Sequence, residues 1–365
     1  MNEQIVKDIA SNLANVSNGI EVEGVYKNYG DFEALKDVNL VVPDGSMTAL
    51  LGPSGSGKST LLRTIAGLET PSQGRVLIGG VDQVKTPVRA RNVGFVFQHY
   101  AAFKHMTVFE NIAFGPRVRK WDKKRIDKTV YELLDLVQLS GLAKRYPGQL
   151  SGGQRQRMAL ARALAVEPTV LLLDEPFGAL DAKVRKDLRT WLRRLHDEVH
   201  VTTIFVTHDQ EEAMDIAQQI VVMNDGAIEQ IGSASDLYDD PANEFVMGFV
   251  GEVNQIGGKL VRPHDLEILT SPTDGAINAK VERIVTLGFS GRVELLLDSE
   301  HKEAWAQLTR HEIDDLDLKV DQPVYVRARP DAVTREDTGV VTSSLTEEDP
   351  PPSDTPTPAG PVLPA

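Results

Sequence analysis

The residues whose types and spacing point most directly to chemistry form a phosphate-loop motif, G-x-x-x-x-G-K-[ST]. The motif is Gly52-Pro53-Ser54-Gly55-Ser56-Gly57-Lys58-Ser59, followed by Thr60. Glycines let the backbone curl until successive N–H groups face the phosphates of a nucleotide, which also meet the positive end of the following helix. In such a loop Lys58 reaches the β- and γ-phosphates and Ser59 binds magnesium. A strand-like run before the loop and a helical pattern from Thr60 favour a nucleotide site over a chance glycine-rich loop.

Two carboxylates, Asp174 and Glu175, follow the apolar run Val170–Leu173. Open α/β sheets bind their ligands at the carboxyl ends of strands, which is where these side chains would lie. Asp174 suits the magnesium shell, directly or through water, and Glu175 can polarise a water that attacks a phosphate in line. An Asp-Glu pair after a strand more often marks a helix start. Together with the phosphate loop, however, it predicts transfer of a phosphoryl group to water.

A second helix N-terminus with small side chains is predicted at Ser151-Gly152-Gly153-Gln154, before the helical pattern Arg155–Ala165. Backbone N–H groups and the helix dipole make such a start an anion site. The alternative is a flexible linker with a capping serine. The phosphate loop favours the anion site, so the chain is predicted to have two phosphate-binding helix starts for one nucleotide.

The order of these motifs resembles that of the ATP-binding cassette (ABC) ATPases, with LSGGQ at 150–154 between the phosphate loop and the Asp-Glu strand. The resemblance runs from about Ile20 to Gly248. It implies an α/β P-loop NTPase domain that uses ATP and Mg²⁺. It also implies that two chains sandwich two ATP molecules, with LSGGQ of one chain closing on the γ-phosphate held by the other.

The resemblance assigns four further residues one by one. Tyr29 matches the aromatic residue that stacks on adenine, although it could equally be a strand-end tyrosine packed on the core. Gln98 matches a glutamine that contacts magnesium and the attacking water, and Asp181 matches a loop that crosses the dimer. His208 matches a switch histidine that contacts the γ-phosphate; its alternative is a partly buried structural histidine. The implied catalytic set is Lys58, Gln98, Glu175 and His208, with Ser59, Gln98 and Asp174 around magnesium.

Short β-branched runs between residues 20 and 250 supply the elements that must position these side chains. The expected strands are Met47–Leu51, Val93–Phe97, Val170–Leu173, Thr202–Val206 and Ile220–Met223. Their alternation with helical patterns predicts a parallel sheet with crossover helices. By the family resemblance, residues 99–165 form a helical subdomain, and Gln98–Phe103 form a socket for a helix of a membrane subunit. The basic run 117–128 can also be read as a solvated helix face.

Outside the cassette, the alternating pattern of residues 251–336 predicts a small all-β domain of barrel or sandwich type. By the resemblance it is an OB/TOBE-like regulatory domain. Residues 1–19 form an N-terminal extension outside the similarity. Residues 337–365 are acidic and proline-rich, so we expect a disordered tail.

Composition excludes several classes of protein. The chain of 365 residues has no cysteine, which excludes disulfides and thiolate zinc sites. Its net charge of −14 argues against a nucleic-acid partner. It contains no apolar run of 18 residues, so we expect a cytosolic chain recruited to the membrane by partners. The histidines show no metal-ligand spacing, and no metal beyond that of Mg-ATP is expected.

Three stretches, 94–115, 188–217 and 260–268, are similar to the sulfate/thiosulfate importer ATPases. The similarity implies an energy-coupling subunit at the cytoplasmic face of a bacterial membrane, working with two transmembrane permease subunits. An extracytoplasmic sulfate-binding protein would be an indirect partner. The motor residues do not reveal the cargo, so molybdate, sugar or polyamine import remains the alternative. A soluble ABC ATPase acting on DNA or ribosomes would need insertions or basic patches, and an inactive scaffold would have lost its catalytic residues.

Overall fold

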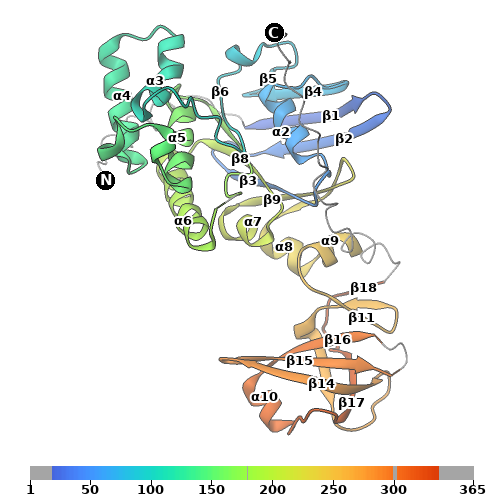
Figure 1. The fold of residues 1–365 in the computed structure, drawn as a ribbon. Coiled ribbons are helices and arrows are strands. Elements are labelled where there is room, and N and C mark those ends of the chain that lie inside the picture. The colour runs from blue at the N-terminus through green and yellow to red at the C-terminus, as the bar shows by residue number, and fades with distance from the viewer. Residues whose placement is uncertain (1–18, 179, 299–301, 337–365) are drawn as a thin grey trace, which may run out of the picture. The chain divides into compact units, whose positions relative to one another are not determined.

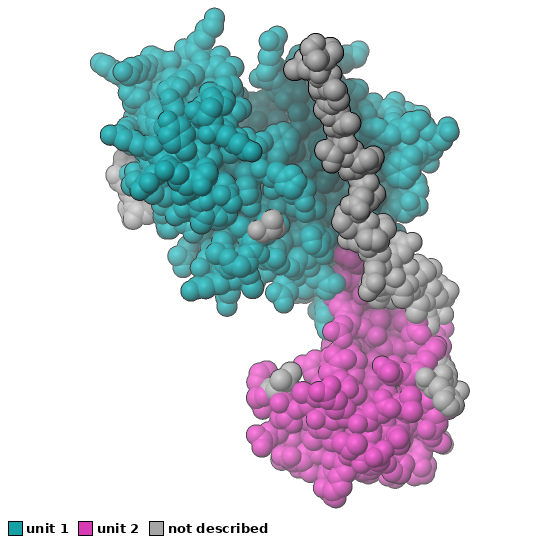
Figure 2. Space-filling model, viewed as in Figure 1, with its two compact units in different colours: residues 1–240 teal, residues 241–365 magenta. Residues whose placement is uncertain are grey.

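The computed structural model describes residues 19–178, 180–298 and 302–336, and the chain forms two compact units, residues 1–240 and 241–365 (Figure 2). The expected N-terminal extension, except Gly19, and the expected acidic tail lie outside the described residues.

A six-stranded sheet forms the centre of the first unit (Figure 1). Five of its strands run parallel, and β10 pairs antiparallel at one edge. In sheet order the strands are β10 (Ala227–Gly232), β9 (Gln219–Asn224), β3 (Met47–Leu51), β8 (Thr202–Thr207), β7 (Val170–Asp174) and β6 (Val93–Val96). The five strands expected from the sequence are confirmed to within one residue at each end.

A second, antiparallel sheet in this unit was not anticipated from the sequence. Its strands, in sheet order, are β2 (Phe32–Val42), β1 (Ile20–Tyr29), β4 (Gln73–Ile78) and β5 (Val81–Asp82). The register between β1 and β2 shifts at three places, so neither strand shows simple alternation of buried and exposed residues.

Helix α2 (Lys58–Ala66) packs in a hydrophobic cluster that contains residues of both sheets. Leu61, Leu62 and Ile65 of α2 are fully buried there. Burial at positions three and four apart gives α2 one wide apolar face, and this face fixes the helix behind the phosphate loop. The helix begins at Lys58, two residues earlier than its sequence pattern suggested.

Three helices after β6 pack on one another: α3 (Val108–Val118), α4 (Lys123–Leu136) and α5 (Gly152–Leu164). Side chains cap the starts of all three, from Thr107, Asp122 and Ser151. The cap on α5 explains why this helix begins three residues before the expected Arg155. The basic run 117–128 is divided between the end of α3, a turn and the start of α4.

The remaining helices of the first unit are α6 (Ala182–Val199), α7 (Gln210–Ile216), α8 (Ala234–Asp239) and the 3-10 turns Val88–Ala90, Ser140–Leu142 and Pro147–Gln149.

The second unit is mainly β-structure around its own hydrophobic cluster. A five-stranded antiparallel sheet has the order β13 (Leu266–Leu269), β17 (Pro323–Ala328), β14 (Ile277–Leu287), β15 (Ser290–Leu297) and β16 (Glu303–Thr309). A smaller sheet has the order β11 (Asn254–Ile256), β12 (Lys259–Val261) and β18 (Thr334–Glu336). The helices are α9 (Glu244–Phe249), α10 (Arg310–Asp315) and the 3-10 turn Pro263–Asp265.

Across the described parts of both units, no helix has the length and apolar character needed to cross a membrane.

Candidate active site

The carboxyl ends of four neighbouring parallel strands bring the expected phosphate-binding and catalytic side chains to one edge of the six-stranded sheet. The phosphate loop follows β3, and Glu175 directly follows β7. His208 directly follows β8, and Gln98 lies two residues after β6. Since parallel strands end at the same edge, the topology itself assembles these groups.

Two glycines of the phosphate loop stand where a side chain would strike backbone. A Cβ on Gly52 would lie 2.2 Å from the Met223 carbonyl oxygen. Gly57 has φ of +95°, and a Cβ there would lie 2.6 Å from the Ala34 carbonyl oxygen. The loop is thus pressed against its neighbours, which fixes its curvature. Gly55, with φ of +82°, has open space around it, and Ser54 and Gly55 are exposed to solvent.

Lys58 begins α2 and turns its ammonium group back over the loop. Its Nζ donates to the carbonyl oxygens of Gly52 at 2.9 Å and Pro53 at 2.6 Å, and to Ser56 Oγ at 3.2 Å. Burial lowers the pKa of Lys58 to about 8, against the opposing effect of the Glu175 and Asp174 carboxylates. A buried cation among neutral carbonyls is poorly compensated, so an anionic phosphate at this loop would stabilise it.

A pair of oxygen donors next to the loop fits a magnesium ion. Ser59 Oγ donates to Asp174 Oδ1 at 2.8 Å, and Asp174 is almost fully buried. A hydroxyl and a carboxylate are the hard oxygen ligands that Mg²⁺ takes. Arg63, one turn after Ser59 on α2, holds the other Asp174 oxygen at 3.2 Å. Sequence reasoning missed Arg63, although its spacing of four residues from Ser59 places both on one helix face.

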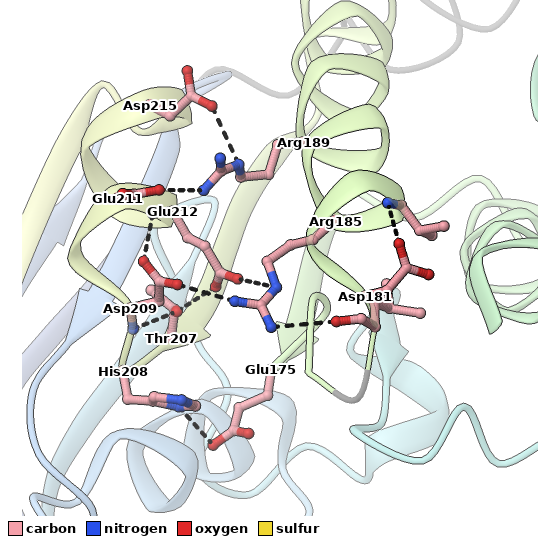
Figure 3. Close-up of polar contacts among 12 residues, drawn as sticks. Glu175, Asp181, Arg185, Arg189, Thr207, His208, Asp209, Glu211, Glu212 and Asp215 are labelled. Carbon is pink, nitrogen blue, oxygen red and sulfur yellow. Dashed lines mark hydrogen bonds and ion pairs between the residues drawn. The ribbon is translucent and has the colours of Figure 1, made fainter. Parts of the chain in front are cut away.

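Glu175 is surrounded by the two other residues expected to handle the attacking water. Its Oε2 accepts a hydrogen bond from Gln98 Nε2 at 2.7 Å, and its Oε1 lies 3.9 Å from His208 Nδ1 (Figure 3). Glu175 has φ of +46°, a left-handed conformation that costs about 1–3 kcal/mol in a residue other than glycine. Strain of this kind, held in place at a strand end, is typical of residues that must be aimed at a ligand.

Tyr29 ends β1 with its side chain at the surface rather than packed on the core. It is 46% exposed, and Lys27 Nζ lies 4.8 Å from the centroid of its ring. Lys27 also pairs with Glu69 at 3.0 Å. The ring is therefore held in place and still accessible, as stacking on a base requires.

The start of α5 is an orderly helix N-terminus whose glycines serve close packing. Ser151 and Gln154 form a reciprocal capping box. A Cβ on Gly152 would meet Leu180 Cδ2 at 2.8 Å, and one on Gly153 would meet Val184 Cγ1 at 2.9 Å. Helix α5 packs mainly on α3, α4, α6 and β6, whereas α2 packs mainly on β2, β7 and β8. Ser151 contacts Gln154 through this capping box.

Asp181 caps α6 by accepting a hydrogen bond from the Val184 backbone N–H at 3.0 Å.

The first two turns of α6 carry an ion-pair network that the sequence did not reveal. Arg185 contacts Asp209 and Glu212, and Arg189 contacts Glu211 and Asp215 (Figure 3). Burial raises the pKa of Glu212, and Arg185 opposes this shift. Within the described residues, no cluster of three or more histidine and acidic side chains is arranged to hold a metal ion.

Two family models match the chain: an ABC transporter model over residues 35–178 and a TOBE domain model over residues 271–334. A sulfate/thiosulfate import ATP-binding protein CysA from Thermosynechococcus vestitus is 57% identical over 85% of this chain and 96% of that protein. Its counterpart of the same name from Mycobacterium tuberculosis H37Rv is 58% identical over 85% of this chain and 92% of that protein.

Solved structures with the same fold include the dimeric bacterial ABC transporter cassette MJ0796. It is 35% identical and covers 59% of this chain and 98% of its own, with a TM-score of 0.53. The structure of cbiO1 from Clostridium perfringens, part of the ABC transporter complex cbiONQ, is 30% identical with a TM-score of 0.58. It covers 62% of this chain and 92% of its own.

Proposed function

This chain belongs to the CysA family of sulfate/thiosulfate import ATP-binding proteins, and we propose that it hydrolyses ATP to drive import of sulfate and thiosulfate. The observation that carries the enzymatic part is the grouping of Glu175, Gln98 and His208 at the sheet edge that carries the phosphate loop. The observation that favours sulfate and thiosulfate is identity above 55% to relatives bearing that name over 85% of the chain.

In the proposed mechanism the residues 52–60 bind the phosphates of ATP through backbone N–H groups, and Lys58 neutralises charge on the β- and γ-phosphates. Tyr29 stacks on the adenine. Glu175 accepts the proton of a water that Gln98 and His208 orient for in-line attack. The hydrogen bond between Gln98 and Glu175 supports this assignment, because it aligns the amide with the carboxylate that must act.

Ser59 and Asp174, with Gln98 beside them, would hold Mg²⁺. When bound, the ion neutralises charge on the phosphate oxygens. Arg63 orients Asp174 by donating a hydrogen bond to its second carboxylate oxygen.

A second copy of the chain completes each site in our proposal. Helix α5 packs mainly on other elements than α2, and Ser151, Gly152, Gly153 and Gln154 would meet the γ-phosphate held by the other chain. Asp181 would lie at the same dimer face. The dimeric cassette among the related structures supports this arrangement.

We further propose that the dimer works at the cytoplasmic face of a bacterial membrane, beneath two permease subunits, with a sulfate-binding protein outside the membrane. Residues 20–250 would form the motor, with 99–165 as its helical subdomain. Residues 251–336 would form the regulatory domain. Membership of cbiO1 in an ABC transporter complex supports the assembly with membrane subunits.

The test is uptake of labelled sulfate in sulfur-starved cells whose only copy of this chain is wild type or Glu175→Gln. We expect wild-type cells to take up sulfate, thiosulfate to compete, and molybdate and a sugar not to compete. We expect the variant to lose uptake although the protein is present at wild-type levels. Normal sulfate uptake by the variant would contradict the proposal, and competition by molybdate or the sugar would reassign the cargo.

A further inference from the structure

Arg185 of α6 contacts two other chain segments through its three guanidinium nitrogens. One terminal nitrogen donates to the Leu180 carbonyl oxygen at 3.3 Å, and the other lies 3.3 Å from Asp209 Oδ2. The third nitrogen, Nε, lies 3.6 Å from Glu212 Oε1. Figure 3 shows this guanidinium between the Asp181 turn on one side and the residues around His208 on the other. A planar fork with several donors suits such a bridge, which lysine cannot reproduce.

The segment that carries His208 is held on both sides by groups that Arg185 contacts. The Asp209 N–H donates to Thr207 Oγ1 at 3.0 Å, and Asp209 Oδ1 accepts from the Glu212 N–H at 3.2 Å. Glu212 in turn accepts a hydrogen bond from the Thr207 hydroxyl. His208 itself is 63% exposed at the side chain, so its position depends on these backbone neighbours rather than on its own packing.

The other segment that Arg185 contacts leads to the start of α5. Leu180 is buried, and its side chain lies so close to Gly152 that a Cβ there would be 2.8 Å from Leu180 Cδ2. Asp181 follows directly and caps α6, the helix that carries Arg185. The Leu180 carbonyl, the Asp181 cap and the start of α5 thus form one packed group.

We propose that Arg185 is a positioning residue that fixes the spacing between His208 and the Leu180–Asp181 segment. In the dimer proposed above, on which this inference rests, His208 faces the nucleotide of its own chain and Asp181 faces that of the partner. Arg185 therefore links the two nucleotide sites of the dimer within each chain. Removing it takes the Arg185 charge away from the neighbouring Asp209 and Glu212 carboxylates and removes its hydrogen bond to the Leu180 carbonyl.

Arg189 offers a matched control one helical turn further along α6. It is also an arginine held by two carboxylates, Asp215 at 3.3 Å and Glu211 at 3.7 Å. Among the described residues both of these carboxylates lie on α7, and Arg185 rather than Arg189 bonds the Leu180 carbonyl, so Arg189 does not make the bridge. Loss of Arg189 removes a comparable charge from the same helix face, one that also acts on Glu212, while the contacts of Arg185 stay in place.

The experiment measures ATP hydrolysis by the purified full-length chain as wild type, Arg185→Ala, Arg185→Lys, Arg189→Ala, Asp209→Asn and Arg185→Ala/Asp209→Asn. We expect Arg185→Ala to lower kcat at least about tenfold with the KM for ATP changed less than about twofold. Arg185→Lys recovers only part of this loss, and Arg189→Ala stays within about twofold of wild type. When Asp209→Asn is already present, adding Arg185→Ala should lower kcat little further, because both substitutions break the same bridge.

Equal kcat in Arg185→Ala and Arg189→Ala, or independent effects of Arg185→Ala and Asp209→Asn, would overturn the inference. If Arg185→Ala does not fold, Arg185→Lys and Asp209→Asn decide, because wild-type kcat in both would also overturn it. Absence of ATP hydrolysis from wild type and Arg189→Ala would instead refute the proposed function.

Discussion

The start of α2 and the start of α5 are both glycine-rich, yet their glycines serve different physical needs. In the phosphate loop, Gly52 and Gly57 abut backbone carbonyls of other strands and turns, and Gly57 adopts a positive φ. In α5, Gly152 and Gly153 are helical and abut the side chains of Leu180 and Val184. Backbone cannot yield to a new methyl group, whereas a side chain can rotate.

The two helix starts also differ in where they hold their basic side chain. The loop before α2 surrounds a buried lysine whose pKa burial has lowered to about 8. The start of α5 carries Arg155, whose guanidinium donates to the Leu150 carbonyl oxygen at 2.8 Å, and Ser151 is exposed. In the function proposed above, the first region binds the nucleotide of its own chain, whereas the second meets the phosphate held by the partner. Variants in the two regions should therefore fail at different steps.

Lys58→Ala should have the largest effect. The loop loses the cation that meets the β- and γ-phosphates, so both ATP affinity and turnover should fall, with turnover reduced on the order of a hundredfold. Fluorescent-nucleotide titration and steady-state hydrolysis measure the two quantities. Lys36→Ala, which removes a surface lysine paired with Asp225, is the control and should change neither. Wild-type affinity in Lys58→Ala would contradict the role of the loop.

Gly57→Ala should destabilise the fold by about 2–4 kcal/mol, through unfavourable backbone conformation and a clash with the Ala34 carbonyl. Gly153→Ala should change the free energy of unfolding by less than about 1 kcal/mol, because gained helix propensity offsets displacement of Val184. Urea denaturation compares the two variants. Gly141→Ala, at a site with open space, is a neutral control. Equal destabilisation by Gly57→Ala and Gly153→Ala would remove the distinction between the two regions.

Ser151→Ala should cost about 1 kcal/mol of stability through loss of the helix cap while leaving ATP binding by the single chain intact. Ser151→Asp separates the cap from the phosphate contact, because aspartate caps helices well but repels a phosphate. We expect Ser151→Asp to restore stability and to hydrolyse ATP more slowly than Ser151→Ala. Faster turnover in Ser151→Asp would show that α5 does not meet a phosphate.

The smallest expected effect is a proton taken up when ATP binds. The free chain's Lys58 loses its proton as pH rises through about 8, and bound phosphates favour the charged form and raise its pKa. The contribution of Lys58 to ATP affinity should therefore stay constant at pH values below its pKa in the free chain. ATP affinity should weaken as pH rises above that pKa. Calorimetry near pH 8.5 in buffers of different ionisation enthalpy measures proton uptake, which Lys58→Ala should abolish. Proton release would contradict the sign of this linkage.

Most of the strands that position the nucleotide site could be predicted from the sequence. Buried parallel strands appear as short apolar runs, and the catalytic and phosphate-binding residues follow directly after them. Val170–Leu173 followed by Asp174 and Glu175 is the clearest example. The antiparallel sheet escaped because β1 shifts register against β2 at several points. Contacts between distant segments also escaped, since no local pattern reveals that Arg63 meets Asp174 or that Arg185 meets Asp209. The left-handed backbone of Glu175 likewise has no signal in residue type.

The most direct test of the central claim is the Glu175→Gln variant of the purified full-length chain, studied with ATP and Mg²⁺ by light scattering and by hydrolysis assay. The substitution keeps the hydrogen-bonding shape beside Gln98 and His208 but removes the group that accepts the water's proton. We predict that ATP stays bound, that two chains associate stably around it, and that turnover is nearly lost. Ordinary turnover in Glu175→Gln, or a monomer that binds ATP without associating, would contradict the account.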